Sequence, residues 1–339
     1  ITVDLSKDGI EQDMGAAGKD TLKSIEGIVG TVSNDYITGS SANNVIDGSG
    51  GNDILLGYQV DDIATVVSGT NYEIKLGTTS GDNTIRGGSG NDTIYVYEGN
   101  DIVVGGEHND TLIIKSTKDT QINFLTNTFE IGNLNTITNV FTQMYASEVY
   151  SMENITTQSG NDNIVGSLEK NIIKTGEGND TVYVKDGENI VNTGTGNDYI
   201  VSGQSVDTID GGEGNDTVDY VEVGESIYID TRDITTDPNT TGNYNPITKE
   251  LLVKLGAEGA AEFDKIKNIE IIKGTNLSDY LYVLNNKQDT IYGNAGDDMI
   301  FGSNDDKLYG DAGADTIEFK LASDKSGVLD GGTGVDDLI

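Results

Sequence analysis

Aspartate and glycine recur together along the chain at a spacing of nine residues. The segments Gly87–Tyr95 (GGSGNDTIY) and Gly211–Asp219 (GGEGNDTVD) are nearly identical, and Thr175–Tyr183, Thr193–Val201 and Gly331–Ile339 share their pattern. The template reads Gly-Gly-x-Gly-x-Asp-x-apolar-x. Carboxylate oxygens and the carbonyls of a glycine turn are hard donors, and Ca²⁺ takes about six to eight of them. The spacing therefore sets hard oxygen donors in a regular row.

This nonapeptide resembles the RTX (repeats-in-toxin) calcium-binding repeat over roughly two thirds of the chain. Weaker copies begin at Gly30, Thr157, Gly274, Gly293 and Gly310. The glycines allow positive φ and a close approach of the backbone to a ligand. The apolar residue that follows each aspartate lies at the centre of a short strand and faces inward.

The resemblance implies an all-β fold, a parallel β-roll, which is a right-handed β-solenoid with about 18 residues per turn. Two nonapeptides close one turn, and the turns stack at the usual interstrand spacing of ~4.8 Å. In this family the ions lie between adjacent turns. We expect several β-roll blocks that are joined by extended β lead-in segments.

A turn of two repeats places successive nonapeptides on two opposite edges of the roll. Within residues 157–219, alternate repeats keep the fourth glycine and the sixth aspartate, which gives an equipped edge with Asp162, Asp180, Asp198 and Asp216 beside Gly160, Gly178, Gly196 and Gly214. The other edge carries Asn171, Asn189 and Asp207. We predict an occupied calcium ladder on the first edge. On the second edge we predict few or no ions, because the asparagines can cap the turns by hydrogen bonding.

The blocks near the two ends follow the same rule with interruptions. In the first block the sixth positions are Asp35, Asp53, Asp92, Asp101 and Asp110, together with Asn44, Asn83 and Asp62. In the last block one edge has Asp279, Asp298, Asp315 and Asp336, and the other has Asp289, Asp306 and Asp324. The spacing slips in the last block, which requires bulges or small loops. Residues 65–77 (TVVSGTNYEIKLG) predict a hairpin excursion.

Three longer segments interrupt the repeats and end in related sequences, LKSIEGIVG, VYSMENITT and FDKIKNIEIIKG. We predict three modules, each with a β lead-in before its roll, at 1–113, 114–219 and 220–339. The rolls are expected at about 30–65 and 78–113, at 157–219, and at 274–339, the last of them truncated. The lead-in strands are expected to cover the open end of a neighbouring roll.

The charge balance excludes several classes of partner. The chain has 57 acidic and 20 basic residues and a net charge of −37, which repels nucleic acid phosphate and anionic lipid. No apolar run is long enough to span a membrane, so we expect no membrane insertion. Cysteine is absent, which excludes a disulfide scaffold and a thiolate site. The regular strand pattern argues against the disorder that such acidity usually indicates.

No catalytic constellation stands out, so we expect no enzymatic activity. His108, the sole histidine, replaces the fourth glycine of a repeat. It is either a ligand beside Asp110 or, as we favour, an exposed turn residue. Five tyrosines at the ninth position face outward and could stack on sugar rings, although ordinary strand composition explains them as well: Tyr95, Tyr183, Tyr282, Tyr292 and Tyr309.

These features predict a calcium-binding structural region of a bacterial cell-surface protein, such as an S-layer subunit or an adhesin. The resemblance implies type I secretion and folding on extracellular calcium. We expect about eight to twelve Ca²⁺ ions, with self-assembly or a cell-surface polysaccharide as further partners. The alternatives are the RTX region of a secreted enzyme or toxin, or a polysaccharide-binding module. In either alternative the active domain lies outside this chain, which we expect to be a fragment of a larger secreted protein.

Overall fold

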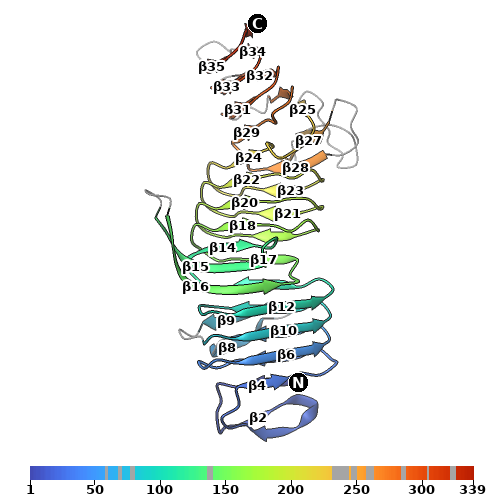
Figure 1. The fold of residues 1–339 in the computed structure, drawn as a ribbon, viewed down its shortest axis with the longest axis vertical. Coiled ribbons are helices and arrows are strands. Elements are labelled where there is room, and N and C mark those ends of the chain that lie inside the picture. Colours follow the sequence, from blue (N-terminus) through green and yellow to red (C-terminus); the bar gives the residue numbers. More distant parts are fainter. Residues whose placement is uncertain are drawn as a thin grey trace. The chain divides into compact units, whose positions relative to one another are not determined.

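The computed structural model describes the chain apart from residues 58–59, 68–70, 77–80, 136–139, 231–243, 246–249, 257–262, 284–287, 304 and 321–325. The described residues form short β-strands and a 3₁₀ turn, η1 (Gly15–Ala17). The chain divides into two compact units, Ile1–Asn163 and Ile164–Ile339. Each unit is a stack of parallel strands (Figure 1), which confirms the predicted all-β, parallel β-roll.

The first unit contains two parallel sheets. One sheet consists of β1 (Thr2–Asp4), β5 (Tyr36–Thr38), β7 (Ile54–Leu56), β11 (Thr93–Val96), β13 (Thr111–Ile114) and β17 (Asn154–Thr156). The other consists of β4 (Gly27–Val29), β6 (Val45–Gly50), β10 (Thr84–Ser89), β12 (Ile102–Glu107) and β16 (Val140–Tyr150). The second sheet continues in antiparallel fashion through β15 (Thr128–Asn135) and β14 (Asp119–Asn123).

Two hairpins branch from the first unit, β2 (Glu11–Asp13) with β3 (Lys19–Thr21), and β8 (Val60–Val67) with β9 (Asn71–Leu76). The second confirms the predicted hairpin excursion. The nine-residue spacing put Asp62 at a sixth repeat position, one turn after Asn44. In the structure Asp62 instead lies in β8 of the hairpin. Asn83, which is 39 residues after Asn44, occupies that place instead and accepts the N–H of Asn44.

The second unit also contains two parallel sheets. One consists of β20 (Thr181–Tyr183), β22 (Tyr199–Val201), β24 (Thr217–Asp219), β29 (Ile271–Lys273), β31 (Thr290–Tyr292), β33 (Lys307–Tyr309) and β35 (Val328–Asp330). The other begins with β19 (Ile172–Lys174), β21 (Ile190–Asn192), β23 (Thr208–Asp210) and β28 (Phe263–Lys267). It continues through antiparallel β27 (Glu250–Leu255) to β25 (Ile227–Asp230), β30 (Tyr280–Tyr282), β32 (Met299–Ser303), β34 (Thr316–Lys320) and β36 (Asp337–Leu338).

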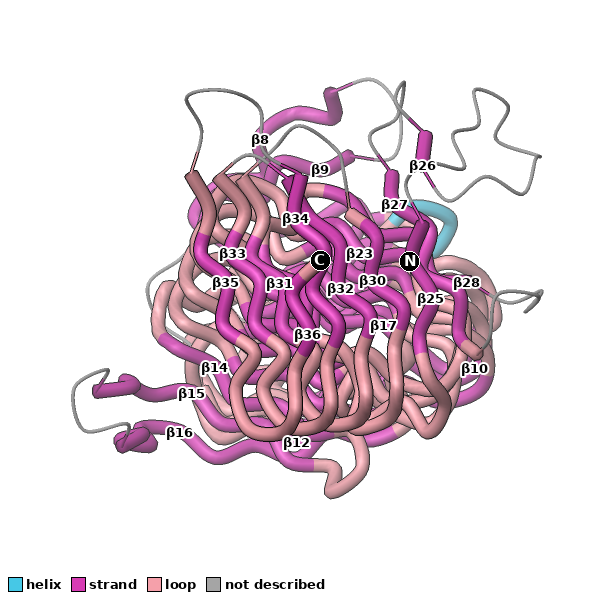
Figure 2. The backbone as a smooth tube through the Cα atoms, turned by 90° about the horizontal axis from the view of Figure 1, so that it is seen from above, coloured by secondary structure: helices cyan, strands magenta, loops and turns pink. Residues whose placement is uncertain are grey.

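Successive turns of the central repeats are 18 residues apart, as predicted. In the last block the separation varies between 17 and 21 residues while the ladder stays continuous. Seen along the stack, β31, β33 and β35 follow one another on the same side (Figure 2). Two nonapeptides therefore close each turn, and small insertions are absorbed outside the strands.

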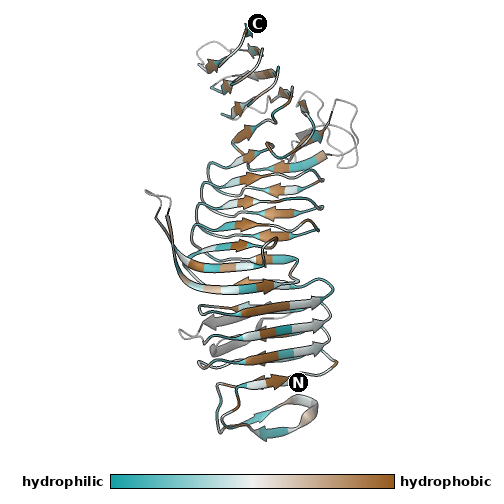
Figure 3. Ribbon diagram, in the orientation of Figure 1, coloured by the Kyte–Doolittle hydropathy of each residue, from teal (hydrophilic) through white to brown (hydrophobic). Residues whose placement is uncertain are grey.

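The core of each roll is narrow because each three-residue strand turns one side chain inward. Val182, Ile200 and Val218 are fully buried at the centres of consecutive strands, and apolar residues occupy the strand centres (Figure 3). In β20 the residues on either side are half-buried, as period-two alternation predicts, whereas Val201, Thr217 and Asp219 beside the other two centres are buried as well. Such a stack buries little apolar surface per turn, so its edges must contribute to stability.

Candidate calcium sites

The aspartates at the sixth repeat position form hydrogen-bonded ladders along one edge of each roll. One carboxylate oxygen, Oδ1, accepts the backbone N–H of the aspartate one turn earlier. Asp198 accepts in this way from Asp180 at 2.8 Å, and Asp216 accepts from Asp198 at 2.9 Å. The same bonds join Asp35, Asp53, Asp92 and Asp110 in the first unit and Asp279, Asp298, Asp315 and Asp336 in the second.

The second carboxylate oxygen, Oδ2, is buried without a hydrogen-bond partner in a set of these aspartates. The set comprises Asp53, Asp92, Asp110, Asp198, Asp216, Asp298 and Asp315. A buried carboxylate oxygen without a partner costs several kcal/mol unless a cation or a donor compensates it. Its repetition at one atom, turn after turn, therefore points to a bound cation.

Backbone carbonyls converge on the same places. A methyl group built on Gly87 would lie 2.5 Å from the carbonyl oxygen of Gly105 and would also overlap Oδ2 of Asp92. At Gly310 the corresponding atoms are the carbonyl oxygen of Gly331, at 2.5 Å, and Oδ2 of Asp315. Glycine at the first repeat position thus keeps open the space in which a carboxylate oxygen and a carbonyl oxygen meet.

This donor set fits Ca²⁺, because a carboxylate oxygen and a backbone carbonyl oxygen are both hard donors of the kind that Ca²⁺ prefers. Within the described residues, no three acidic or histidine side chains converge on one point. Such a result is expected where the backbone supplies most donors and each turn supplies one carboxylate. The predicted glycines Gly160, Gly178, Gly196 and Gly214 have φ values of 115°, 136°, 139° and 151°, a range that favours glycine.

Burial raises the pKa of four ladder aspartates, and the neighbouring carboxylates raise it further. The pKa of Asp53, of Asp110 and of Asp216 rises to about 6, and that of Asp298 rises to about 7. Without a cation these groups therefore keep their protons to a higher pH than an ordinary aspartate does. A bound Ca²⁺ would supply the positive charge that reverses this effect.

The opposite edge is built differently, because asparagine side-chain amides donate hydrogen bonds to the backbone carbonyls there. The Nδ2 group of Asn189 donates to the carbonyl of Gly187 at 2.7 Å and to that of Asp186 at 3.1 Å. Asn83 similarly donates to the carbonyls of Gly57 and Gly81, at 2.6 and 2.8 Å. The amide thus takes acceptors that a cation would otherwise need, and the bonds of Asn189 are the turn-capping bonds predicted for it.

Asp101 and Asp207, which we predicted as ligands, lie on this asparagine edge. Oδ1 of each accepts both the backbone N–H and the side-chain amide of the asparagine one turn earlier. Burial raises the pKa of each to about 7. Their role as calcium ligands stays a prediction, with less support than the other edge has.

The remaining predicted ligands lie in three places. Asp162 belongs to the first unit, where its Oδ1 accepts the N–H of Thr120 at 2.7 Å. Asp289 and Asp306 form their own short ladder in the second unit, at 3.0 Å. Asp336 stands at the end of its ladder and is exposed, and Asp324 lies outside the described residues.

In the second unit the equipped edge changes from one sheet to the other. Asp180, Asp198 and Asp216 precede the strands β20, β22 and β24 of one sheet, whereas Asp279, Asp298 and Asp315 precede β30, β32 and β34 of the other.

Sequence reasoning missed three acidic residues that join the ladders from outside the repeats: Asp264, Glu153 and Glu270. Oδ1 of Asp264 accepts the N–H of Asp207 at 2.7 Å, and burial raises the pKa of Asp264 to about 8. The two glutamates accept the N–H groups of Asp110 and Asp216. The signal for the glutamates was present, since each lead-in segment ends in a related sequence that contains one.

The structure also places His108 and the tyrosines. His108 is exposed in its turn with φ of 90°, as we favoured, and its Nδ1 lies 2.7 Å from the carbonyl oxygen of Glu107. The rings of Tyr292 and Tyr309 stack on one another with centroids 4.6 Å apart and planes 10° apart. Each ring therefore covers one face of the other, which reduces the aromatic surface available to a sugar.

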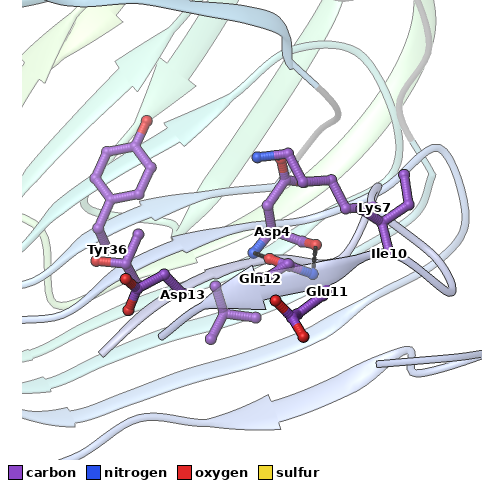
Figure 4. A pocket seen from close by; sticks show the side chains of 9 residues that line it. Asp4, Lys7, Ile10, Glu11, Gln12, Asp13 and Tyr36 are labelled. Atoms are coloured by element: carbon purple, nitrogen blue, oxygen red, sulfur yellow. Dashed lines mark hydrogen bonds and ion pairs between the residues drawn. The ribbon is translucent and has the colours of Figure 1, made fainter. Parts of the chain in front are cut away.

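One cavity lies apart from the ladders, near the first residues of the chain (Figure 4). Its volume is about 290 Å³, and its lining includes Asp4, Lys7, Glu11 and Gln12. Lys7 Nζ lies 3.2 Å from Asp4 Oδ2, and the side-chain amide of Gln12 donates to the carbonyl of Asp4 at 2.8 Å. These contacts stabilise the local fold. Among the described residues, no helix has the length and apolar character to cross a membrane.

Stacked glycine turns, whose ladder aspartates place buried carboxylate oxygens beside backbone carbonyls, define a calcium-binding parallel β-roll. The family model described as RTX calcium-binding nonapeptide repeat (4 copies) matches residues 29–64, 77–112, 156–191, 183–218 and 285–305. These segments of the chain are therefore RTX calcium-binding nonapeptide repeats. A comparison with curated proteins gave no match.

Proposed function

We propose that this chain is a non-enzymatic, calcium-dependent structural region of a secreted or cell-surface protein of the S-layer or adhesin type. The observation that carries the proposal is the recurrence of a buried, unpartnered Oδ2 atom along the aspartate ladders. A fold with this feature depends on its cation for stability. The chain would therefore remain unfolded where calcium is scarce and would fold where calcium is abundant, outside the cell.

The physical basis is the coupling between metal binding and folding. The described rolls have narrow aliphatic cores, and their edges bring many carboxylates together within a chain of net charge −37. Without cations the carboxylates repel one another or must take up protons. With cations bound, the binding free energy becomes folding free energy. We propose that about eight to twelve ions bind along the equipped edges.

Circular dichroism in chelator and in calcium tests this proposal. We expect the β signal to be lost in EDTA and restored by millimolar Ca²⁺. Mg²⁺ at the same ionic strength is the control, because it screens charge equally well but demands a compact octahedral shell. An unchanged β signal in EDTA, or equal restoration by Mg²⁺, would contradict calcium-dependent folding.

A second measurement concerns the structural role. Ordered two-dimensional assemblies that form on adding calcium, seen by electron microscopy, would support the S-layer type. Binding to a polysaccharide is less favoured, because Tyr292 and Tyr309 stack on one another and because the net charge repels an anionic glycan. Strong glycan binding by the folded chain would favour that alternative instead.

A further inference from the structure

Two glutamates outside the nonapeptides stand in register with the last aspartates of repeat ladders. Thr111 pairs with Asn154, so Asp110 is level with Glu153, and Thr217 pairs with Ile271, so Asp216 is level with Glu270. The family match ends at residues 112 and 218, before both glutamates.

Each glutamate makes the hydrogen bond that the next aspartate of a ladder would make. Oε2 of Glu153 accepts the N–H of Asp110 at 2.7 Å, and Oε2 of Glu270 accepts the N–H of Asp216 at 3.0 Å. Within the ladder, Oδ1 of Asp110 accepts the N–H of Asp92 at 2.8 Å. The glutamate thus continues the ladder by one rung, with one additional methylene.

A backbone carbonyl from outside the repeats also takes the position of the carbonyl that a further repeat would supply. A methyl group built on Gly105 would lie 2.5 Å from Oδ2 of Asp110 and would also overlap the carbonyl oxygen of Ser151. At Gly211 the corresponding atoms are Oδ2 of Asp216, at 2.7 Å, and the carbonyl oxygen of Asn268. These carbonyls stand where the first-position glycine of a further repeat would place its own.

The backbone that presents these carbonyls is unusual in both copies. Ser151 has φ of 50° and Asn268 has φ of 53°, a left-handed conformation that is uncommon outside glycine. Each lies two residues before its glutamate. The tripeptides Ser151–Glu153 and Asn268–Glu270 therefore imitate the ligand face of a glycine turn with non-glycine residues.

The unpartnered aspartate oxygens point to what these tripeptides hold. Asp110 and Asp216 are both fully buried, and their Oδ2 atoms lack hydrogen-bond partners. We infer that each tripeptide completes a further Ca²⁺ site, in which the aspartate Oδ2, the carbonyl of Ser151 or Asn268 and the glutamate carboxylate are donors. Such a site lies where the repeats give way to lead-in strands. Calcium therefore also binds the join between repeat and non-repeat structure.

The third copy of the tripeptide, Ser24–Glu26, provides a matched control. Ser24 has φ of 51°, but Glu26 is exposed and is level with Asn44, because Gly27 pairs with Val45. The ladder residue level with Glu26 is thus an asparagine, whereas Glu153 and Glu270 are level with aspartates. We assign it no ion.

Calcium stoichiometry of the full chain by isothermal titration tests the inference, which rests on the proposed calcium-dependent function. Glutamine can still accept the aspartate N–H but lacks the negative charge, so the substitution separates the hydrogen bond from metal binding. We expect Glu153→Gln and Glu270→Gln each to lose one ion, and Glu26→Gln to lose none. Unchanged stoichiometry in the first two variants would overturn the inference. Calcium binding by the wild type would still stand, whereas a wild type that binds no calcium refutes the proposed function itself.

A measurement on the wild type covers the case in which a variant fails to fold. In crystals grown with calcium, we expect an anomalous difference peak between Asp110 and Glu153 and another between Asp216 and Glu270. Peaks along the aspartate ladders without peaks at these two positions would overturn the inference.

Discussion

The contact between stacked fourth-position glycines makes a quantitative prediction for Gly196→Ala. A Cβ on Gly196 would overlap the carbonyl oxygen of Gly178 and lie 2.5 Å from its carbonyl carbon. Carbon atoms in contact prefer a separation of about 3.5–4.0 Å. The turns must therefore part by about 1 Å, unless the backbone distorts instead.

The energetic cost follows from the bonds at this contact. The N–H of Gly178 donates to the carbonyl of Thr195 at 2.8 Å, and the N–H of Thr195 donates to the carbonyl of Gly176 at 2.8 Å. A separation of about 1 Å breaks both bonds, at about 1 kcal/mol each. Alanine at φ of 139° adds backbone strain of about 1–3 kcal/mol. We expect the free energy of unfolding to fall by about 3–5 kcal/mol.

Thermal unfolding in saturating calcium, followed by circular dichroism, measures this loss. For a unit of this size it corresponds to a decrease in Tm of about 6–20 °C. Gly224→Ala is the matched control, because a Cβ there would meet its nearest neighbour, the side chain of Gln204, at 3.7 Å. The reasoning would be refuted if Gly196→Ala and Gly224→Ala had the same Tm.

Three further outcomes are expected. Asp298→Asn removes a buried ladder carboxylate and should weaken calcium binding at its site by about tenfold or more in isothermal titration. Asp297→Asn, on the exposed side of the same turn, should leave calcium binding unchanged. Equal effects of the two variants would contradict the ladder assignment. His108→Gly removes a non-glycine residue at φ of 90° and should raise stability by about 1 kcal/mol, and a lower Tm would show that His108 has a favourable role. Burial raises the pKa of Asp101 and Asp207 to about 7 in the fold. The contribution of these protonated groups to the stability of the metal-free fold is therefore fully present below the ordinary aspartate pKa, and it is lost as pH rises through about 7. In EDTA we therefore expect more β signal at pH 5 than at pH 8, and the reverse order would contradict the sign of these shifts.

Much of the fold follows from a local rule, and that part could be predicted. Glycine at the turn, aspartate at the sixth position and an apolar residue at the eighth recur within nine residues, so each nonapeptide carries its own turn, ligand and strand. The division of Asp180 and Asp198 from Asn171 and Asn189 onto two edges follows from the same period. The capping role of the asparagines was predictable as well, because their amides reach carbonyls of the same turn.

Other features depend on segments that are far apart in the sequence. Asn83, rather than Asp62, continues the ladder from Asn44, because the β8–β9 hairpin leaves the stack and returns. The tethering of Asp207 to Asp264, across 57 residues, depends on how β28 stacks on β23.

The sequence by itself determined the period, the ligand type and the two-edged turn, because these are set by contacts within one or two repeats. Only the tertiary structure decided which acidic residues outside the repeats join a ladder. Glu153 lies 43 residues from Asp110, and Glu270 lies 54 residues from Asp216. Their register is set by strands that stack after a long excursion of the chain, and no local spacing encodes that pairing. The negative charge was visible in the sequence, whereas its arrangement into buried, unpartnered oxygens was visible only in the fold.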